Sequence, residues 1–225
     1  MSLLRNVFKS MRINQWIKNL FLFIPFIFGG KLFIPEDLIR TVLAFLLFCI
    51  TSSGVYIIND ILDRKKDRFH PLKKNRPITS GALPVKQALV ISSILLFSSL
   101  LLSAYFNIHF FVLLLAYVVL HLLYSFILKR EVLLDVILIA LGFELRIWAG
   151  AVILLIIPSI WLQLCVFLLA IFLALLKRRH EKISLYPDAA NHRNVLTHYD
   201  IYFLDQLIMI SATLCITFYL SLIHI

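Results

Sequence analysis

Residues 38–67 read LIRTVLAFLLFCITSSGVYIINDILDRKKD, an apolar run followed directly by a polar one. The apolar part is long enough to cross the ~30 Å hydrocarbon layer of a membrane as a helix. At ~3.6 residues per turn, the polar residues Asn59, Asp60, Asp63 and Asp67 fall on one broad helical face. The stretch therefore predicts a membrane-spanning helix that ends in a cluster of acids.

The composition of the whole chain supports this interpretation. The 225 residues are 61% hydrophobic, whereas a soluble domain is usually ~45–50% apolar. No small-residue cleavage site follows the first apolar run, so we do not expect a cleaved signal peptide. We predict an all-α bundle of about seven transmembrane helices that forms a single integral membrane domain over residues 1–225. The expected spans are 19–34, 38–58, 87–106, 109–128, 132–155, 159–177 and 204–224, and Pro25 and Gly29-Gly30 interrupt the first.

The basic residues predict an orientation. Most of the 22 lysines and arginines lie before residue 19, in the 59–86 loop or in the 177–203 loop, and only Lys31 and Arg40 fall on the opposite side. By the positive-inside rule, this asymmetry puts the N-terminus and both loops in the cytosol, with the protein in the inner (plasma) membrane. Because the bases lie between spans rather than on a soluble domain, the net charge of +10 does not indicate nucleic-acid binding.

The acidic cluster predicts a metal site. Carboxylates this close together repel one another unless a cation lies among them. Mg²⁺ prefers oxygen ligands and favours sites that it shares with substrate phosphates. Basic residues follow the cluster at once, which points to an enzyme that acts on a diphosphate at the membrane surface. The alternative is a solvated helix end with i,i+4 pairs such as Asp60–Arg64.

These motifs resemble a known family. The pattern Asn-Asp-x-x-Asp-x-x-x-Asp at 59–67, followed by Arg-Pro-x-x-x-Gly at 76–81, is similar to the UbiA superfamily of membrane prenyltransferases. The sequence DRFHPLKKNRPI at 67–78 resembles the branch that transfers phosphoribose to a polyprenyl phosphate, the decaprenyl-phosphate phosphoribosyltransferases. Other motifs agree in order and spacing, so that the resemblance covers about residues 12–210. They begin at Arg12, Tyr124, Gly142, Lys177 and Arg193.

The resemblance implies a glycosyl transfer. The donor would be phosphoribosyl diphosphate, the acceptor a polyprenyl (decaprenyl) phosphate and the cofactor Mg²⁺. Asp60, Asp63 and Asp67 would be the catalytic acids and, with Asn59, would hold the metal against the donor diphosphate. The substrate-binding residues that it implies are Lys18, Asn19, Asn59, Lys73, Arg76, Tyr124, Lys129, Asp135, Arg146, Lys177 and Arg178.

Among these residues, Lys177 and Arg178 are candidates for the 5-phosphate of the donor or for the lipid phosphate, and both assignments stay open. Asp135 and Arg146 lie eleven residues apart on one helical face, where charges inside a span face a cavity or a partner. The alternative for these two is a structural ion pair that bridges helices. Glu144 falls on the opposite side of the same helix and has no counterpart in the family pattern; it would pair with Arg146 or with another span.

The chain departs from the wider family in two respects. Prenyl-diphosphate enzymes of this type usually carry a second aspartate-rich motif after the sixth span, whereas residues 177–182 here read KRRHEK. A basic loop suits substrates whose phosphates meet bases directly. Members of the family also generally have nine spans, so two C-terminal helices are missing from this chain by that comparison.

Two rival functions are kept. An aromatic prenyltransferase would move a polyprenyl group from its diphosphate to an aromatic acceptor, and the missing second acidic motif argues against it. A non-enzymatic transporter or lipid-binding scaffold would also contain charges inside the membrane. The scaffold hypothesis predicts that Asp63→Asn leaves function intact and that Mg²⁺ has no effect.

Overall fold

The computed structural model describes residues 3–69, 71–126, 131, 133–184 and 199–223. These residues form helices and their connections, and none of them lies in a strand, in agreement with the predicted all-α class. In chain order the elements are α1 (Leu3–Met11), the 3₁₀ helix η1 (Ile13–Phe23), α2 (Ile24–Phe28), α3 (Pro35–Asp67), the 3₁₀ turn η2 (Lys73–Asn75), α4 (Pro77–Ser80), α5 (Val85–Phe106), α6 (Ile108–Phe126), α7 (Leu134–Leu154), α8 (Ile160–Ser184) and α11 (Ile201–Ile223).

Six of the described helices are long and apolar enough to cross a membrane: α3, α5, α6, α7, α8 and α11. They coincide with six of the seven expected spans. The remaining segment, 19–34, is helical only to Phe28 and is divided between η1 and α2. Pro25 lies at the start of α2, and Gly30 adopts a φ of 70°, a conformation that favours glycine and ends the helix. The count of about seven spans is therefore approximately right.

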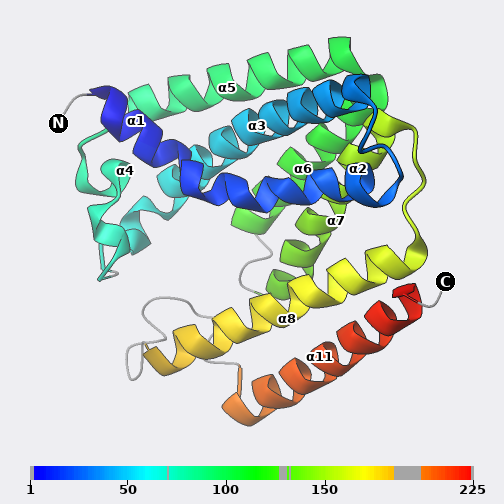
Figure 1. Cartoon of the computed structure of the whole chain (residues 1–225). Coiled ribbons are helices and arrows are strands. Elements are labelled where there is room, and N and C mark those ends of the chain that lie inside the picture. Colours follow the sequence, from blue (N-terminus) through cyan, green and yellow to red (C-terminus); the bar gives the residue numbers. More distant parts are fainter. Residues whose placement is uncertain (1–2, 70, 127–130, 132, 185–198, 224–225) are drawn as a thin grey trace.

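The helices form two pairs with a central layer between them (Figure 1). Helix α3 lies beside α5, and α8 lies beside α11. Helix α7 contacts both sides, because it packs against α8, α6, η1 and α3. Half of the spanning part of α7 is buried, and 56% of that of α3, compared with 6% for α11. These contacts and this burial make α7 central between the two pairs and α11 peripheral.

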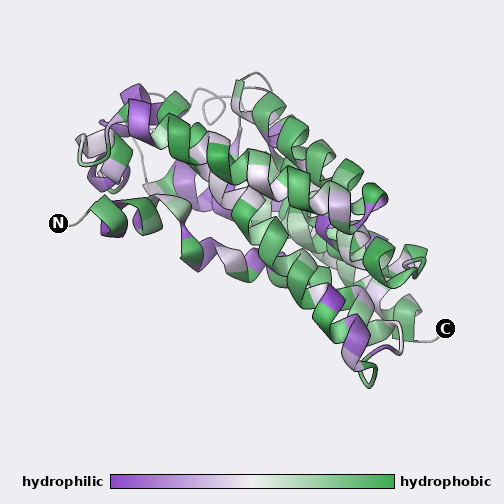
Figure 2. Ribbon diagram, turned by 90° about the horizontal axis from the view of Figure 1, so that it is seen from above, coloured by the Kyte–Doolittle hydropathy of each residue, from purple (hydrophilic) through white to green (hydrophobic). Residues whose placement is uncertain are grey.

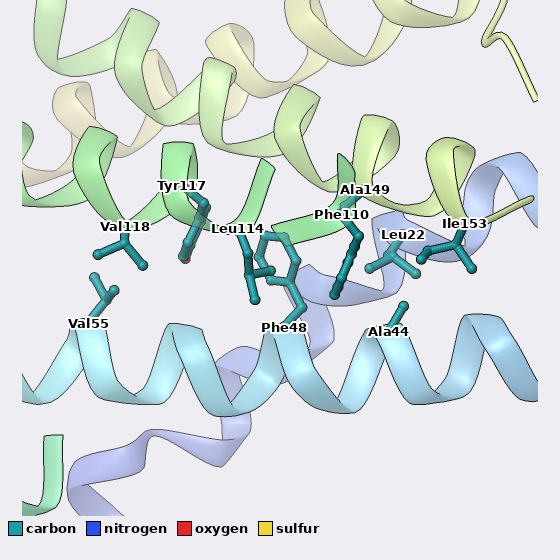
Figure 3. Close-up of a cluster of buried hydrophobic side chains, with 10 residues drawn as sticks. All are labelled: Leu22, Ala44, Phe48, Val55, Phe110, Leu114, Tyr117, Val118, Ala149 and Ile153. Carbon is teal, nitrogen blue, oxygen red and sulfur yellow. The ribbon is translucent and has the colours of Figure 1, made fainter. Parts of the chain in front are cut away.

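The main core lies between α3 on one side and α6, α7 and η1 on the other (Figure 3). Phe48 of α3 packs edge-to-face on Tyr117 of α6, with ring centroids 4.7 Å apart. Leu22 of η1 fits against α7 only because residue 150 is glycine. A Cβ at Gly150 would lie 2.0 Å from the carbonyl oxygen of Leu22. The sequence thus allows η1 to approach the central helix at backbone distance.

One end of the molecule collects the motif-bearing segments. Helices α1 and α4, the C-terminal end of α3 and the C-terminal end of α8 all lie at the left of Figure 1. Figure 2 shows many hydrophilic residues near this end, while hydrophobic residues dominate along the spanning helices. The two polar loops that the sequence predicts on one face therefore start from the same end of the bundle.

Candidate active site

The acidic residues occupy the last two turns of α3. Asp60 and Asp67 are buried, with 1% and 5% of their surface exposed. Both accept hydrogen bonds from one nitrogen, Nη1 of Arg76, at 3.0 Å and 2.5 Å. Arg12, at the N-terminal cap of η1, forms a second ion pair with Asp60. Two arginines from separate segments therefore meet two carboxylates of one helix.

Arg76 reaches α3 because the segment around it is anchored. It caps α4, with Pro77 as the first helical residue. Ile78 and Leu83, on either side of the turn, are fully buried. Helix α1 holds the same segment from outside, since the side-chain amide of Asn6 donates to the carbonyl oxygen of Ala82 at 3.1 Å. The guanidinium is thereby fixed beside the acids.

Asn59 and Asp63 complete the predicted metal set on α3. Asn59 Oδ1 accepts a hydrogen bond from Ser125 Oγ of α6 at 2.9 Å, which fixes the amide oxygen, and Asp63 is half-buried. Within the described residues, no three His, Cys, Asp or Glu side chains are gathered closely enough to form a metal centre. The four-residue metal set stays a prediction.

The donor chemistry nevertheless fits a hard divalent cation. Carboxylate and amide oxygens are the ligands that Mg²⁺ prefers. The oxygens of Asp60 and Asp67 converge on a single cationic nitrogen of Arg76, so the two carboxylates already share one positively charged partner. A metal ion bound by these oxygens would compete with the guanidinium for them.

A cavity of about 370 Å³ adjoins the acidic cluster. Asn59 lies on its wall, together with four cations and a large apolar surface. The cations are Arg12, Lys18, Arg146 and Lys177. The other lining residues are Val55, Tyr56, Leu120, His121, Tyr124, Ser125, Leu138, Ile139, Phe143, Ala170, Leu173 and Ala174.

Lys18, on η1, is a cation of the cavity wall whose protonation is perturbed. Partial burial, first, and then the nearby charges of Lys177, Arg146 and Arg12 together lower its pKa from 10.5 to about 8, although part of the side chain stays exposed. Removing water from an ammonium group and placing it beside other cations both disfavour the charged form. The wall of the cavity is therefore strongly positive around this residue.

Arg146 is buried inside the bundle and touches only neutral partners. Its guanidinium donates to Asn19 Oδ1 at 2.8 Å, to the carbonyl oxygen of Gly142 at 2.5 Å and to the hydroxyl of Tyr117 at 3.1 Å. It also lies over the ring of Phe48, with 5.2 Å to the centroid. Asn19 in turn donates to side chains of α3, so that it positions Arg146 and does not line the cavity.

Asp135 and Arg178 belong to a separate buried cluster. Arg178 Nε lies 2.6 Å from Asp135 Oδ2, and the Tyr199 hydroxyl donates to the other carboxylate oxygen at 2.8 Å. Burial raises the pKa of Tyr199, which keeps its hydroxyl protonated as a donor. Neither Asp135 nor Arg178 lines the cavity. Asp135 thus forms an ion pair between α7 and α8 with Arg178, and not with Arg146. Its predicted role in substrate binding stays a prediction.

Some of the remaining predicted residues line the cavity and others do not. Tyr124 and Lys177 line the cavity, and Lys73 lies on η2 next to the segment that carries Arg76. Lys129 lies outside the described residues. Glu144 Oε1 is buried and forms no hydrogen bond within the described part of the chain, so the structure shows no pairing with Arg146.

Sequence reasoning missed several residues of the site. Arg12 stood in a quoted motif, but nothing in its spacing pointed to Asp60, which lies 48 residues away. Tyr56 precedes Asp60 by four residues, so helical periodicity could have placed it on the same face of the helix as that carboxylate. Tyr117 and His121 lie in an apolar helix with no signal that distinguishes them from packing residues.

Comparison with known proteins shows the family to which the chain belongs. A sequence model of the UbiA prenyltransferase family matches residues 22–223. Decaprenyl-phosphate phosphoribosyltransferase of Mycolicibacterium smegmatis is 31% identical over 222 residues, which are 97% of this chain and 70% of that protein. The protein of the same name from Corynebacterium glutamicum is 33% identical over 215 residues, which are 94% of this chain and 65% of the relative.

Solved structures share the fold. A UbiA homologue from Archaeoglobus fulgidus, bound to DMAPP and Mg²⁺, superposes with a TM-score of 0.79 at 20% identity. The match covers 96% of this chain and 77% of that one. The chain therefore spans about two thirds to three quarters of the length of the proteins that it resembles here.

Proposed function

We propose that this chain, which belongs to the UbiA prenyltransferase family, transfers 5-phosphoribose from phosphoribosyl diphosphate to a polyprenyl phosphate and releases diphosphate. The two relatives described above carry the name of this activity. The proposal extends to the location of the chain in the inner membrane, with the site on the cytosolic side, because the basic residues gather at that end.

The observation that carries the proposal is the charge of the cavity. Four cations line it, next to an acidic cluster that suits a metal-bound diphosphate. A reaction between two phosphorylated substrates needs positive charge for both of them. Transfer of a prenyl group to an aromatic acid needs positive charge for one diphosphate and one carboxylate, which is less than two phosphorylated substrates need. The basic sequence KRRHEK at 177–182 points the same way.

Asn59, Asp60, Asp63 and Asp67 would hold Mg²⁺, which was bound in the solved Archaeoglobus homologue. When bound, the metal neutralises the negative charge that builds up on the departing diphosphate. The chain itself supplies Arg76 at the same place, and we assign Arg76 and Lys73 to the phosphates of the donor. A guanidinium fixed in advance beside the leaving group costs no reorganisation during the reaction.

The attacking group is a phosphate oxygen of the lipid. It forms a bond to carbon 1 of the ribose from the face opposite the departing diphosphate, which inverts the configuration at that carbon. A phosphate monoester is already ionised near neutral pH, since its second pKa is about 6. The reaction needs no strong base for this reason, and catalysis consists mainly of positioning and electrostatic stabilisation.

The apolar walls have a protective role. Val55, Leu120 and Phe143 face the cavity from three different helices. They limit the water that reaches carbon 1, so the lipid phosphate competes with less hydrolysis of the donor.

The test is reconstitution. Purified protein in detergent receives phosphoribosyl diphosphate labelled in the ribose, decaprenyl phosphate and Mg²⁺, and we expect labelled lipid-linked phosphoribose and free diphosphate in equal amounts. Asp60→Asn serves as the inactive control. Absence of the lipid product, together with turnover of a prenyl diphosphate and an aromatic acid, would replace this proposal by the aromatic prenyltransferase.

A further inference from the structure

We propose that Lys18 and Lys177, with Arg146 next to them, form the seat for the phosphate monoester of the lipid acceptor, and that the apolar face of α8 beside Lys177 receives its isoprenoid chain. This inference rests on the proposed function and specifies which of its two substrates the cationic wall binds. It also separates Lys177 from its neighbour Arg178, which the sequence left as equal candidates.

Lys18 is a cation without a counter-ion. Within the described residues it forms no ion pair and no hydrogen bond, although it lines the cavity. Its charged neighbours are Lys177, Arg146 and Arg12, all of the same sign. A group in this position gains more from an incoming anion than a lysine that already has a carboxylate partner. The side chain is accessible through the cavity, so a ligand can reach it.

Arg146 adds a second uncompensated charge. Its three hydrogen-bond partners, Asn19, Gly142 and Tyr117, are all neutral. In the described part of the chain no carboxylate forms an ion pair with it. A buried guanidinium in a membrane span is costly without an anion nearby. The neutral partners hold the side chain in place, while its charge remains available to the cavity.

Arg178 is already bound by carboxylates of the protein, whereas its neighbour Lys177 lines the cavity. The guanidinium of Arg178 contacts Asp135 and Glu181, both at 2.6 Å, and only 1% of its side chain is exposed. Lys177 lies on the cavity wall; its ammonium is 4.0 Å from Glu181, and 65% of its side chain is exposed. One helical position thus separates a structural arginine from a lysine that a ligand can approach.

The surface beside Lys177 favours an amphiphile over a sugar phosphate. Ala174, Leu173 and Ala170 precede it by three, four and seven residues, which places them on the same face of α8. Leu173 is 51% exposed although it lies on a cavity wall. An isoprenoid chain would cover this apolar stripe, whereas phosphoribosyl diphosphate is polar throughout and gains nothing from it.

The acids give the complementary argument. A phosphate monoester carries nearly two negative charges at neutral pH, and the arginines nearest Asp60 and Asp67 are already paired with those carboxylates, whereas Lys18 has no ion pair among the described residues. The donor diphosphate can share a metal ion with those acids, but the lipid phosphate has no such bridge and is best placed against the lysines. In this assignment the lipid phosphate lies against Lys18 and Lys177, and the donor diphosphate lies at the C-terminal end of α3.

The test measures binding of farnesyl phosphate and of farnesol to the purified full chain in detergent, without donor or metal. We expect farnesyl phosphate to bind more tightly than farnesol, and Lys18→Ala and Lys177→Ala each to weaken it by about tenfold while farnesol binding stays unchanged. Lys18→Arg should retain most of the affinity. Lys86→Ala, an exposed lysine at the start of α5, is the matched control and should bind as the wild type does.

The same variants are then assayed for transfer. The inference requires that Lys18→Ala and Lys177→Ala raise the KM for decaprenyl phosphate and leave the KM for phosphoribosyl diphosphate within about twofold. It is overturned if they raise the donor KM while farnesyl phosphate binds as before, because the lysines would then hold a donor phosphate. If wild-type protein shows no transfer but binds farnesyl phosphate through these lysines, the seat stands and the proposed function fails.

Discussion

Asp60 and Asp67 lie seven residues apart on α3 and accept hydrogen bonds from the same nitrogen of Arg76, at 3.0 Å and 2.5 Å. Two turns of helix bring the carboxylates onto one face, and the anchored segment before α4 brings the guanidinium to them. Because a divalent ion bound by these oxygens would compete with Arg76, the three residues link metal affinity to the position of a phosphate-binding side chain.

This link predicts opposite effects of Arg76→Ala. Removing the guanidinium should strengthen the binding of Mg²⁺ in the absence of donor, because the carboxylates lose a competing cation. The same change should lower kcat by roughly 10²- to 10³-fold, since one preorganised donor to the leaving group is lost. Calorimetric titration with Mg²⁺ and the transfer assay measure the two effects.

The control for Arg76 is Arg68→Ala, an exposed arginine that follows Asp67 directly. It removes the same charge from the same end of the molecule without touching the shared nitrogen. If Arg76→Ala leaves both metal affinity and rate at the level of Arg68→Ala, the guanidinium has no part in the site.

The lowered pKa of Lys18 predicts a pH dependence of anion binding. In the free protein its ammonium loses the proton as the pH rises through about 8. Farnesyl phosphate stays dianionic above neutral pH, so its affinity should fall between pH 7.5 and about 9, by up to about tenfold as one charge-assisted hydrogen bond is lost. The other titratable groups that line the cavity are Lys177 on α8, Tyr56 on α3 and Tyr124 and His121 on α6, and the other charged groups are Arg12 and Arg146.

Dissociation constants measured across this pH range test the assignment. Lys18→Arg should flatten the profile, since an arginine keeps its charge throughout. A wild-type profile that persists unchanged in Lys18→Arg would attribute the titration to Lys177 or to a tyrosine.

The sequence was sufficient where structure is local. Six of the seven predicted spans follow from runs of apolar residues, and the shared face of Asp60 and Asp67 follows from helical periodicity, so these features were predicted correctly. The divided segment at 19–34 was harder to predict, because an 11-residue 3₁₀ helix is unusual. Its stability depends on contacts that α7 and α3 supply.

The sequence could not predict which side chains pair with each other between helices. Asp135 and Arg146 share a helix face, yet Asp135 pairs with Arg178, 43 residues away, and Arg146 with Asn19, 127 residues away. Periodicity shows which way a side chain points from its own helix, but the order of helices around it decides what it meets. The same reason hid Arg12 as the partner of Asp60.

The close approach of η1 to α7 predicts that Gly150→Ala destabilises the protein. The added Cβ would meet the main-chain oxygen of Leu22 at 2.0 Å, and a backbone cannot move aside as a side chain does. We expect a loss of about 1–3 kcal/mol, the usual cost of overpacking, seen as a lower melting temperature in detergent. Because η1 carries Lys18, farnesyl phosphate binding should weaken as well.

Gly142→Ala is the matched variant on the same helix. Its Cβ would lie 3.2 Å from His121 Cε1, an atom of a side chain that can shift by a few tenths of an ångström. A smaller loss of stability than in Gly150→Ala is expected. Equal losses would mean that helix propensity, and not the contact with Leu22, determines the effect.

The buried pair of Arg178 and Asp135 predicts a large loss of stability when one partner is removed. The carboxylate is fully buried, and its second oxygen is held by Tyr199. Asp135→Asn removes one of the two carboxylates that contact the buried guanidinium and leaves only Glu181, so we expect a loss near the lower end of the about 3–5 kcal/mol that is typical of a broken buried pair. Replacing both partners, as in Asp135→Leu with Arg178→Met, should recover much of the loss, because the desolvated charges disappear together.

Arg179→Ala is the control, because it breaks the neighbouring pair with Asp205, which is solvent-exposed. It should change stability little, since water already screens those charges. Melting temperatures of these three variants in one detergent make the comparison. A double variant no more stable than Asp135→Asn would show that the cluster contributes packing and not compensated charge.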